Sequence, residues 1–245
     1  MSVKILLCGS GGRMGRAISA ICADHDCQIS FSVDLGDDPA AGIDGCDVVI
    51  DFSLREATLP LARLSAQAGK PMVIGTTGHQ PEEKAEIESL TSRIPVVWAG
   101  NFSTGVNLLF YLTEIAARVL DEQSDFDAEL IEMHHRLKKD APSGTADRLL
   151  EILKKARQLN DNMVVHGRSG MIGERPTREI GSHALRGGDV VGDHTVLFAG
   201  IGERLELTHR ATDRKIFAAG ALRAAKWVIG QSPNLYSMQD VLGLV

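Results

Sequence analysis

The sequence of 245 residues predicts an α/β protein with a doubly wound parallel sheet in one domain and an inserted α+β domain whose open sheet is mainly antiparallel. Residues 3–103 alternate short apolar runs with helical patterns, which is typical of βαβ units. Residues 164–211 instead carry segments of alternating polarity, which favour an antiparallel sheet covered on one face. An Ala-rich helical segment follows, and it suits a return of the chain to the first domain.

Each expected strand of the first domain is a short apolar run that leads into a turn or loop. The strands are expected at Val3–Cys8, Gln28–Asp34, Asp47–Ser53, Pro71–Gly78 and Ile94–Ser103. Helical patterns follow the glycines at residues 9–12 and also cover Glu56–Ala68 and Glu82–Ser92. Runs rich in Val and Ile without alternation are typical of strands buried on both faces.

The second domain starts with an amphipathic helix and then mixes helices with strands. Its first elements are expected at Val106–Leu120 (helix), Asp125–His135 (strand) and Thr145–Ala156 (helix). The segment GDHTVLFAGIGERLELTHRA, residues 192–211, predicts a β-hairpin with Gly200, Ile201 and Gly202 in its turn.

The last helix, expected at Arg214–Ile229, follows the β segments of the second domain. A helix at this place in the chain can pack on the first sheet, which makes the second domain an insertion. We therefore expect residues 1–103 and 213–245 to form one domain and residues 104–212 to form the other.

Composition excludes several classes of partner. The formal net charge of −6 argues against binding to nucleic acid or to an anionic membrane surface. No apolar run approaches the ~18 residues of a membrane helix, and the N-terminal run is too short for the core of a signal peptide. The cysteines at positions 8, 22, 27 and 46 form no CxxC pair and suit reduced, buried thiols. We therefore expect a cytoplasmic protein.

A glycine-rich loop, CGSGGRMG, follows the first strand and opens a helix. Its glycines at positions 9, 12 and 15 allow a sharp turn and leave room for a pyrophosphate at the positive end of the helix. The spacing is GxxGxxG rather than the strict GxGxxG, and a tight structural turn is the alternative. The strand before the loop and the helix after it favour a Rossmann-like, dinucleotide-binding domain. The expected contacts are Gly9, Ser10, Gly11, Gly12, Arg13 and Met14.

The second strand ends in Asp34, about 20 residues after the glycine loop, where such folds place a carboxylate that binds the ribose hydroxyls. A solvated aspartate at a strand end is the alternative. Leu35 offers no positive charge for the 2′-phosphate of NADPH, although Arg13 in the loop could. The sequence therefore favours NADH and leaves NADPH open.

Two later loops, Gly75–Gly78 and Ala99–Ser103, follow strands of the same sheet. In a doubly wound sheet, ligands bind beyond the carboxyl ends of the strands. Small residues and backbone amides there could hold a nicotinamide ring and its carboxamide, and ordinary turn chemistry is the alternative. The expected contacts are Gly75, Thr76, Thr77, Ala99, Gly100, Asn101 and Phe102.

Titratable residues are concentrated in the segment EMHHRLKKDAPSGTA, residues 132–146. On a strand, His134 and His135 point to opposite faces, so we do not expect both to do the same work. Lys138 lies in the following loop, and residues 143–145 open a helix whose N–H groups can bind a carboxylate. The segment combines a candidate acid, a candidate cation and an anion-binding helix end, although a plain N-cap serine is the alternative for the helix start.

A metal site is the competing hypothesis, because the chain contains further histidines. No HExxH motif or paired Cys/His spacing occurs, so we expect no metal. The histidines expected only to cap or line β segments are His166, His183, His194 and His209.

Taken together, these motifs resemble the 4-hydroxy-tetrahydrodipicolinate reductase (dihydrodipicolinate reductase) family of diaminopimelate and lysine biosynthesis. The resemblance rests on the glycine loop, the GTTG loop, NFSTGVN at residues 101–107, the segment 132–146 and the hairpin at 192–211. It covers nearly the whole chain in the same order, and the segment 132–146 is its most specific part.

The resemblance implies that the first domain binds NAD(P)H and that the second domain binds a small cyclic dicarboxylate. It implies His134 as proton donor or acceptor and Lys138 as proton donor. The residues expected to hold the substrate are His135, Ser143, Gly144 and Thr145. Some members of the family have a basic residue where this chain has Leu35, which puts NADPH preference in doubt. Family members are usually tetramers built through the sheet of the second domain, so we expect a homotetramer.

The implied reaction reduces 4-hydroxy-tetrahydrodipicolinate to tetrahydrodipicolinate with loss of water. A hydride from the nicotinamide adds to an electron-poor C=C–C=N system, and a proton from an ammonium or imidazolium group neutralises the resulting charge. Two alternatives stay open at this point. One is another two-domain dehydrogenase acting on an amino acid or a sugar, and the other is a nucleotide sensor without catalysis.

Overall fold

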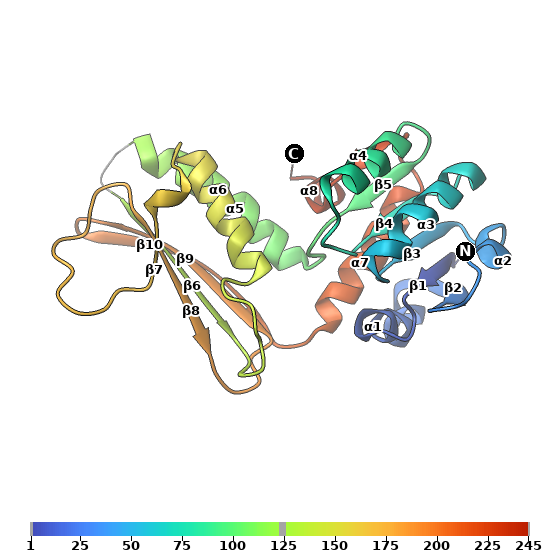
Figure 1. Cartoon of the computed structure of the whole chain (residues 1–245), viewed down its shortest axis with the longest axis horizontal. Coiled ribbons are helices and arrows are strands. Elements are labelled where there is room, and N and C mark those ends of the chain that lie inside the picture. The colour runs from blue at the N-terminus through green and yellow to red at the C-terminus, as the bar shows by residue number, and fades with distance from the viewer. Residues whose placement is uncertain (1, 123–125, 245) are drawn as a thin grey trace. The chain divides into compact units, whose positions relative to one another are not determined.

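The computed structural model describes residues 2–122 and 126–244, and the chain divides into two compact units (Figure 1). Unit 1 is formed by Met1–Thr104 and Arg214–Val245, and unit 2 by Gly105–Asp213. The expected strand start at Asp125 lies outside the described residues. Within those residues, every helix is too short or too polar to cross a membrane.

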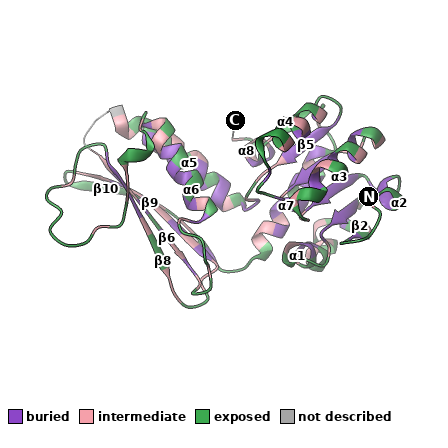
Figure 2. Ribbon diagram, in the orientation of Figure 1, coloured by how far each residue is buried: buried purple, intermediate pink, exposed green. Residues whose placement is uncertain are grey.

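A six-stranded parallel sheet forms the centre of unit 1, with the strand order β11-β5-β4-β3-β1-β2. Its strands are β1 (Val3–Cys8), β2 (Cys27–Val33), β3 (Val48–Asp51), β4 (Met72–Ile74), β5 (Pro95–Trp98) and β11 (Asn234–Tyr236). β3 and β4 are buried along their whole length (Figure 2), as their continuous apolar runs predict. The predicted parallel, doubly wound sheet is confirmed.

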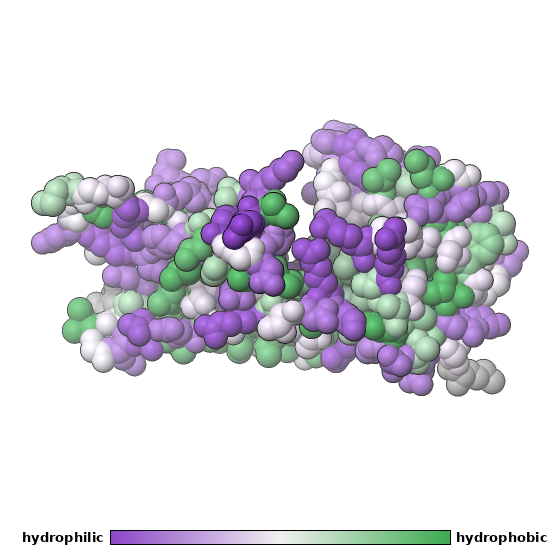
Figure 3. All heavy atoms as spheres, turned by 90° about the horizontal axis from the view of Figure 1, so that it is seen from below, coloured by the Kyte–Doolittle hydropathy of each residue, from purple (hydrophilic) through white to green (hydrophobic). Residues whose placement is uncertain are grey.

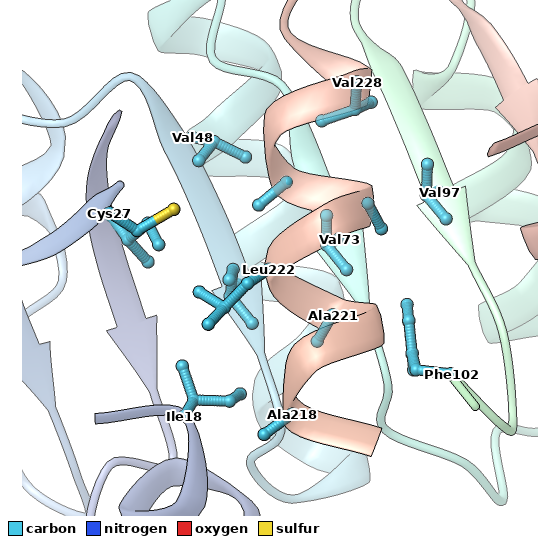
Figure 4. Packing of buried hydrophobic residues seen from close by; sticks show 14 of the residues in the cluster. Ile18, Cys27, Val48, Val73, Val97, Phe102, Ala218, Ala221, Leu222 and Val228 are labelled. Carbon is cyan, nitrogen blue, oxygen red and sulfur yellow. The ribbon is translucent and has the colours of Figure 1, made fainter. Parts of the chain in front are cut away.

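Helices cover both faces of this sheet (Figure 1). On the face of the molecule seen in Figure 3, hydrophilic side chains are prominent. The helices are α1 (Arg13–Ile21), α2 (Ala40–Ile43), α3 (Arg55–Ala68), α4 (Pro81–Leu90), α7 (Lys215–Val228) and α8 (Met238–Leu242), with a 3₁₀ turn η1 (Ala23–His25). Leu7 points into the apolar cluster that contains α7, whereas its neighbour Leu6 points into the cluster that contains α3. Small side chains such as Ala218 and Ala221 allow α7 to lie close to the sheet (Figure 4).

Unit 2 contains a five-stranded sheet with the order β10-β9-β6-β8-β7. Its strands are β6 (Asp127–His134), β7 (Val164–His166), β8 (Ile180–Arg186), β9 (Gly192–Gly200) and β10 (Glu203–Ala211). Its helices are α5 (Thr104–Glu122), α6 (Gly144–Ala156) and the 3₁₀ turn η2 (Asp161–Met163). α5 and α6 pack on one face, against residues such as Leu130 and Val196, and no described helix lies on the opposite face (Figure 1).

This second sheet is mixed, whereas we expected it to be mainly antiparallel. β9 pairs antiparallel with β6 and β10, and the predicted hairpin is confirmed, with Ile201 and Gly202 as its two-residue turn. β8, however, runs parallel to both β6 and β7. α6 and the segment after it return the chain to the starting end of β6, which makes parallel pairing possible. Alternating polarity is the same in both pairing directions, so the sequence pattern could not distinguish them.

Besides the two 3₁₀ turns, three short elements were missing from the expected set, namely α2, β11 and α8. β11 has three residues at the sheet edge and therefore carries almost no pattern. α8 did carry a readable signal. The hydroxyl of Ser237 caps its first turn, and the carboxylate of Asp240 accepts the N–H of Ser237, which is a capping box.

Gly220 lies within α7 at a point where a methyl group has no room. A Cβ built on it would lie 1.8 Å from the carbonyl oxygen of Phe102, which is backbone and cannot rotate away. We expect Gly220→Ala to lower the free energy of unfolding by about 1–3 kcal/mol, although alanine has the higher helix propensity. Urea unfolding measures this. The control is Gly230→Ala, where the nearest atom would be 4.0 Å away. Unchanged stability of Gly220→Ala would contradict the packing of α7.

Candidate active site

The glycine loop of unit 1 is a tight turn between β1 and α1. Gly9 has a φ of 77°, and a Cβ on it would lie 2.3 Å from the carbonyl oxygen of Phe52. A Cβ on Gly15 would lie 2.2 Å from the carbonyl oxygen of Gly9, so α1 approaches the loop closely. Both positions therefore require glycine. The N-cap is Gly12, which has no side chain that could cap the first turn of α1. This helix start is therefore suited to bind a pyrophosphate.

Asp34 lies beside this loop. Its Oδ2 accepts a hydrogen bond of 2.7 Å from the N–H of Gly11, and its Oδ1 accepts one of 2.9 Å from the N–H of Leu35. A cavity of about 370 Å³ opens next to the carboxylate. Its apolar lining residues include Leu35, Pro39, Leu54, Ala57, Pro60 and Leu61. A flat aromatic base fits such a lining, and the carboxylate lies where it could accept hydrogen bonds from ribose hydroxyls.

The two later loops of unit 1 lie at the carboxyl ends of β4 and β5. Gly75 donates its N–H to the end of β3, and Ala99 donates its N–H to the end of β4. Thr77 and Gly100 are exposed, whereas Thr76 is buried. Both loops are therefore fixed at the strand ends and present exposed positions beyond them, where a nicotinamide could bind.

Phe102 is placed differently from its neighbours in the third loop. It is 2% exposed, and its ring packs edge-on against Phe52 with 5.5 Å between the ring centroids. The side chain of Asn101 accepts the N–H of Ser103 at 2.9 Å and shapes the loop. The side chain of Phe102 is thus part of the core, and only its backbone can contact a cofactor.

In unit 2, His134 is the last residue of β6 and is 8% exposed. Its Nδ1 contacts Oε2 of Glu132, which lies two residues earlier on the same face of the strand. Oε1 of Glu132 accepts hydrogen bonds from Nη2 of Arg186 at 3.0 Å and from the N–H of Ser143 at 3.2 Å. A carboxylate can only accept, so Nδ1 of His134 carries the proton in this contact and Nε2 is left for proton transfer.

Ser143 is the N-cap of α6, as the alternative reading of the helix start proposed. Its Oγ accepts the N–H of Ala146 at 3.3 Å and lies 3.2 Å from Nε2 of His194. The serine is 2% exposed, so its hydroxyl is used within the protein. Gly144 is exposed with open space beside its Cα, and Thr145 follows it in the first turn. The open part of this helix end is therefore at Gly144.

Lys138 lies in the loop after β6, and its Nζ donates a hydrogen bond of 2.7 Å to Oδ2 of Asp140. This hydrogen bond lowers the pKa of Asp140. The carbonyl of Asp140 accepts Nη2 of Arg186 at 2.7 Å, which joins the loop to the network of Glu132. The backbone N–H of His135 donates a hydrogen bond of 2.7 Å to the carbonyl of Val190, in the loop between β8 and β9, and the ring of His135 is half-buried. The structure thus brings Lys138 and His134 into one hydrogen-bonded network.

His194, which we expected only to line a strand, lies beside His134, with 5.2 Å between their ring centroids. It pairs with Glu132 across β6 and β9 and with His209 across β9 and β10, so these side chains share one face. Burial, followed by the charge of His134, lowers the pKa of His194 to about 4. His194 and Val196 lie two residues apart on β9, so the sequence pattern predicts that His194 is buried on the same face as Val196. That His194 lies opposite Glu132 depends on the register between β6 and β9, which the sequence pattern does not give.

Glu132, His134 and His194 offer donor atoms within 4.8 Å of one another, which makes them a candidate metal site. The donor set does not fit a divalent cation. Both oxygens of Glu132 and Nε2 of His194 already take part in hydrogen bonds, and the guanidinium of Arg186 lies 3.0 Å from Glu132. A second cation would be repelled by that guanidinium. We interpret the cluster as a network for holding and moving a proton.

Comparisons with known proteins match both units. Residues 3–102 match a family model described as "Dihydrodipicolinate reductase, N-terminus", and residues 105–242 match "Dihydrodipicolinate reductase, C-terminus". A 4-hydroxy-tetrahydrodipicolinate reductase of Akkermansia muciniphila is 51% identical, covering 99% of this chain and 98% of that protein. One from Thiobacillus denitrificans is 47% identical over 100% of both chains.

The fold is likewise shared with solved structures. A dipicolinate-bound dihydrodipicolinate reductase from Paenisporosarcina sp. TG-14 superposes with a TM-score of 0.82 at 22% identity, covering 98% of this chain and 99% of that one. A probable dehydrogenase from Thermotoga maritima superposes with a TM-score of 0.61 at 12% identity, covering 99% of this chain and 93% of that one.

The buried carboxylate of Glu132 predicts a dependence of stability on pH. Burial raises its pKa, but hydrogen bonds from His134 and Arg186 outweigh burial and lower the pKa from 4.5 to about 2. Because the pKa is lower in the folded state, this stabilisation is complete above about pH 4.5 and is lost as the pH falls toward 2. We expect Glu132→Gln to cost about 3 kcal/mol in the free energy of unfolding at pH 7, and less as the pH decreases through this window.

Urea unfolding between pH 7 and pH 3 measures the difference between the two proteins. The matched control is Glu114→Gln, which removes a surface ion pair with Arg118 on α5. It should change stability by no more than about 0.5 kcal/mol at any pH. A cost of Glu132→Gln that stays constant over the whole pH range would contradict the assignment of Glu132 as a buried, hydrogen-bonded carboxylate.

Proposed function

From the premise that the chain belongs to the dihydrodipicolinate reductase family, we propose its reaction. It catalyses the NAD(P)H-dependent reduction of 4-hydroxy-tetrahydrodipicolinate to tetrahydrodipicolinate, with loss of water. This reaction belongs to diaminopimelate and lysine biosynthesis. The observation that carries the proposal is the network in unit 2, which holds His134 and Lys138 near the open helix end at Gly144. The likeness to other dehydrogenases is at the level of the fold and favours no other substrate. Unpaired cysteines suit the cytoplasm as its location.

A nicotinamide cofactor would supply the hydride. In this proposal unit 1 binds the dinucleotide, and its residues fit that group. The start of α1 would bind the pyrophosphate, and the apolar cavity beside Asp34 would take the adenine and ribose. The exposed positions of the loops at Gly75 and Ala99 would contact the nicotinamide.

Unit 2 would bind the cyclic dicarboxylate and handle its proton. The helix end at Gly144 and Thr145 and the ammonium of Lys138 would hold the carboxylates, with His135 in the same loop. Hydride addition leaves a negative charge on the substrate, and a proton must neutralise it. Two residues are candidates for handling this proton. Lys138 is assigned as a proton donor, and His134 as a proton donor or acceptor through Nε2. A positioned acid of this kind typically contributes ~10²–10⁴-fold to the rate.

NADH is the cofactor that the residues around the ribose position favour. Asp34 accepts the N–H of Gly11, and Asp37 accepts the N–H of Asp34 at 2.8 Å, so two carboxylates stand at this position. Leu35, next to them, is 90% exposed and carries no charge. The 2′-phosphate of NADPH would be repelled by these carboxylates, whereas the hydroxyls of NADH can donate hydrogen bonds to them.

The open face of the unit 2 sheet is the surface that we propose for assembly into a homotetramer. Ile131 on β6 is 37% exposed and Leu185 on β8 is 45% exposed, and both point away from α5 and α6. Exposed apolar side chains on an uncovered sheet face are common at an interface between protein chains.

Substitution of Lys138 tests the reaction. We expect Lys138→Ala to lower kcat by ~10²–10⁴-fold, because the ammonium that donates the proton is lost, while NADH binding is retained. NADH oxidation is measured with substrate freshly generated from aspartate semialdehyde and pyruvate. Lys139→Ala, which removes the exposed neighbouring lysine, is the matched control and should keep the wild-type rate. A wild-type rate in Lys138→Ala would exclude Lys138 from the chemistry.

Substitution of Asp34 tests the cofactor preference. Asp34→Ala should raise the Kd for NADH roughly 10-fold, since a charged acceptor of the ribose hydroxyls is lost. The Kd for NADPH should change little, because removal of the repulsion offsets any lost hydrogen bond. Calorimetric titration with the two cofactors gives both values, and each serves as the control for the other. Equal weakening of both would show that Asp34 does not discriminate between them.

The assembly is tested by light scattering on the purified protein. We expect a particle of four chains, each of 26.4 kDa. Ile131→Glu should split it into smaller species, because a charge would be buried at the interface. Ile115→Glu is the matched control, since Ile115 is 42% exposed on α5 and does not lie on the open sheet face. A monomeric wild-type protein would rule out this assembly.

A further inference from the structure

The turn that follows β3, residues 51–53, touches all three loops expected to bind the dinucleotide. A Cβ on Gly9 would lie 2.3 Å from the carbonyl oxygen of Phe52, and a Cβ on Gly75 would lie 2.1 Å from its ring. The same ring packs edge-on against Phe102 in the third loop. Phe52 is therefore a common contact of loops that are far apart in the sequence.

The topology of the sheet explains this position. β1 lies between β2 and β3, so the strand order reverses at the border of β1 and β3. Ligands of doubly wound sheets bind at such a reversal, outside the carboxyl ends of the strands. Phe52 and Ser53 line the cavity beside Asp34, across from the glycine loop. We expected only a strand end here from the sequence.

Asp51 holds this turn in place. Its carboxylate is fully buried, and Oδ1 accepts the N–H of Ser53 at 2.9 Å and contacts the hydroxyl of the same residue. Oδ2 accepts the hydroxyl of Thr58 at 2.7 Å, and Thr58 is itself fully buried in α3. One carboxylate thus joins the end of β3, the turn and α3.

Among the described residues, this carboxylate takes part in no ion pair, and its polar contacts are with Ser53 and Thr58. Within the described part of the chain, no basic side chain forms an ion pair with Asp51, and the nearby Arg55 pairs with Glu56 and Glu83 instead. Burial of a carboxylate without a countercharge is costly compared with apolar packing. Apolar residues could join β3 to α3 equally well. We therefore explain the presence of a carboxylate by the hydrogen bonds that it makes to the turn at Ser53.

We propose that Asp51 is a positioning residue of the dinucleotide site and acts through Phe52, an inference that rests on the proposed function. Its hydrogen bonds hold the backbone of the turn against Gly9 and the ring of Phe52 against Gly75 and Phe102. The three loops thereby keep the spacing that a dinucleotide requires. A misplacement of about 1 Å in such a site can reduce function ~10²-fold.

Calorimetric titration of the full chain with NADH tests the proposal, at a temperature well below the unfolding midpoint of each variant. We expect Asp51→Ala to raise the Kd roughly 10-fold or more, because the turn loses its hydrogen bonds. Asp51→Asn should stay within about 3-fold of the wild type, since an amide can accept from Ser53 and donate to Thr58. In steady-state kinetics, Asp51→Ala should raise the KM for NADH and leave the KM for the dicarboxylate unchanged.

Val228→Ala is the control for a general loss of stability. Val228 is fully buried in the same core, at the end of α7 remote from Phe102 (Figure 4). It should lower the unfolding midpoint without changing the Kd for NADH. If Asp51→Ala does not fold, Phe52→Leu decides the question, because it keeps an apolar side chain but loses the ring contacts with Gly75 and Phe102. It should raise the Kd for NADH in the same way.

Wild-type affinity for NADH in Asp51→Ala or in Phe52→Leu would overturn the positioning role. Equal weakening by Asp51→Asn and Asp51→Ala would also overturn it, because the hydrogen bonds would then not be what matters. Failure of the proposed function gives a different result. In that case the wild type binds NADH but does not oxidise it with the substrate described above, and the comparison of affinities still decides the role of Asp51.

Discussion

A carboxylate buried in a protein must be given partners, and in unit 2 this requirement organises the candidate active site. Glu132 is 1% exposed and meets it with the ring of His134, the guanidinium of Arg186 and the backbone N–H of Ser143. These partners come from β6, β8 and the start of α6. The same contacts orient the imidazole, fix the helix end and hold the end of β8 beside them. Residues far apart in the sequence are thus placed by the need to satisfy one charge.

In unit 1 the corresponding constraint is the direction of the strands. All its strands run parallel, so the turns that follow β1, β3, β4 and β5 are brought to one edge of the sheet. Close backbone contacts then fix the distances between them. Gly9 and Gly75 leave no room for a side chain against Phe52, and this residue fills the space between their loops. The proposed dinucleotide site is therefore a consequence of topology, adjusted by a few tight contacts.

The parts of this arrangement that depend on local spacing could be predicted from the sequence. The glycine loop is one example. We did not predict the contact of Glu132 with His134, although residues two apart on a strand share a face. The role of His194 was not readable, because it depends on the register between β6 and β9. Arg186 reaches Glu132 only because β8 runs parallel to β6, a direction that alternating polarity cannot reveal. Phe102 was expected to contact the cofactor, but local sequence does not show that its ring faces the core.

Burial distinguishes the ion pair of Glu132 with Arg186 from the ion pair of Lys138 with Asp140 in the candidate active site. Glu132 would repel a dicarboxylate by about 4 kcal/mol per unit charge at 4 Å in a medium of effective dielectric constant 20. Its pairing with Arg186 offsets that repulsion, and breaking the pair is costly because it would leave the buried carboxylate of Glu132 without its countercharge. The side chain of Asp140 is 63% exposed, so the ion pair that it forms with Lys138 contributes at most ~1 kcal/mol. In the proposed reaction, Lys138 can therefore leave Asp140 for a substrate carboxylate at little cost, while Glu132 and Arg186 keep His134 in place.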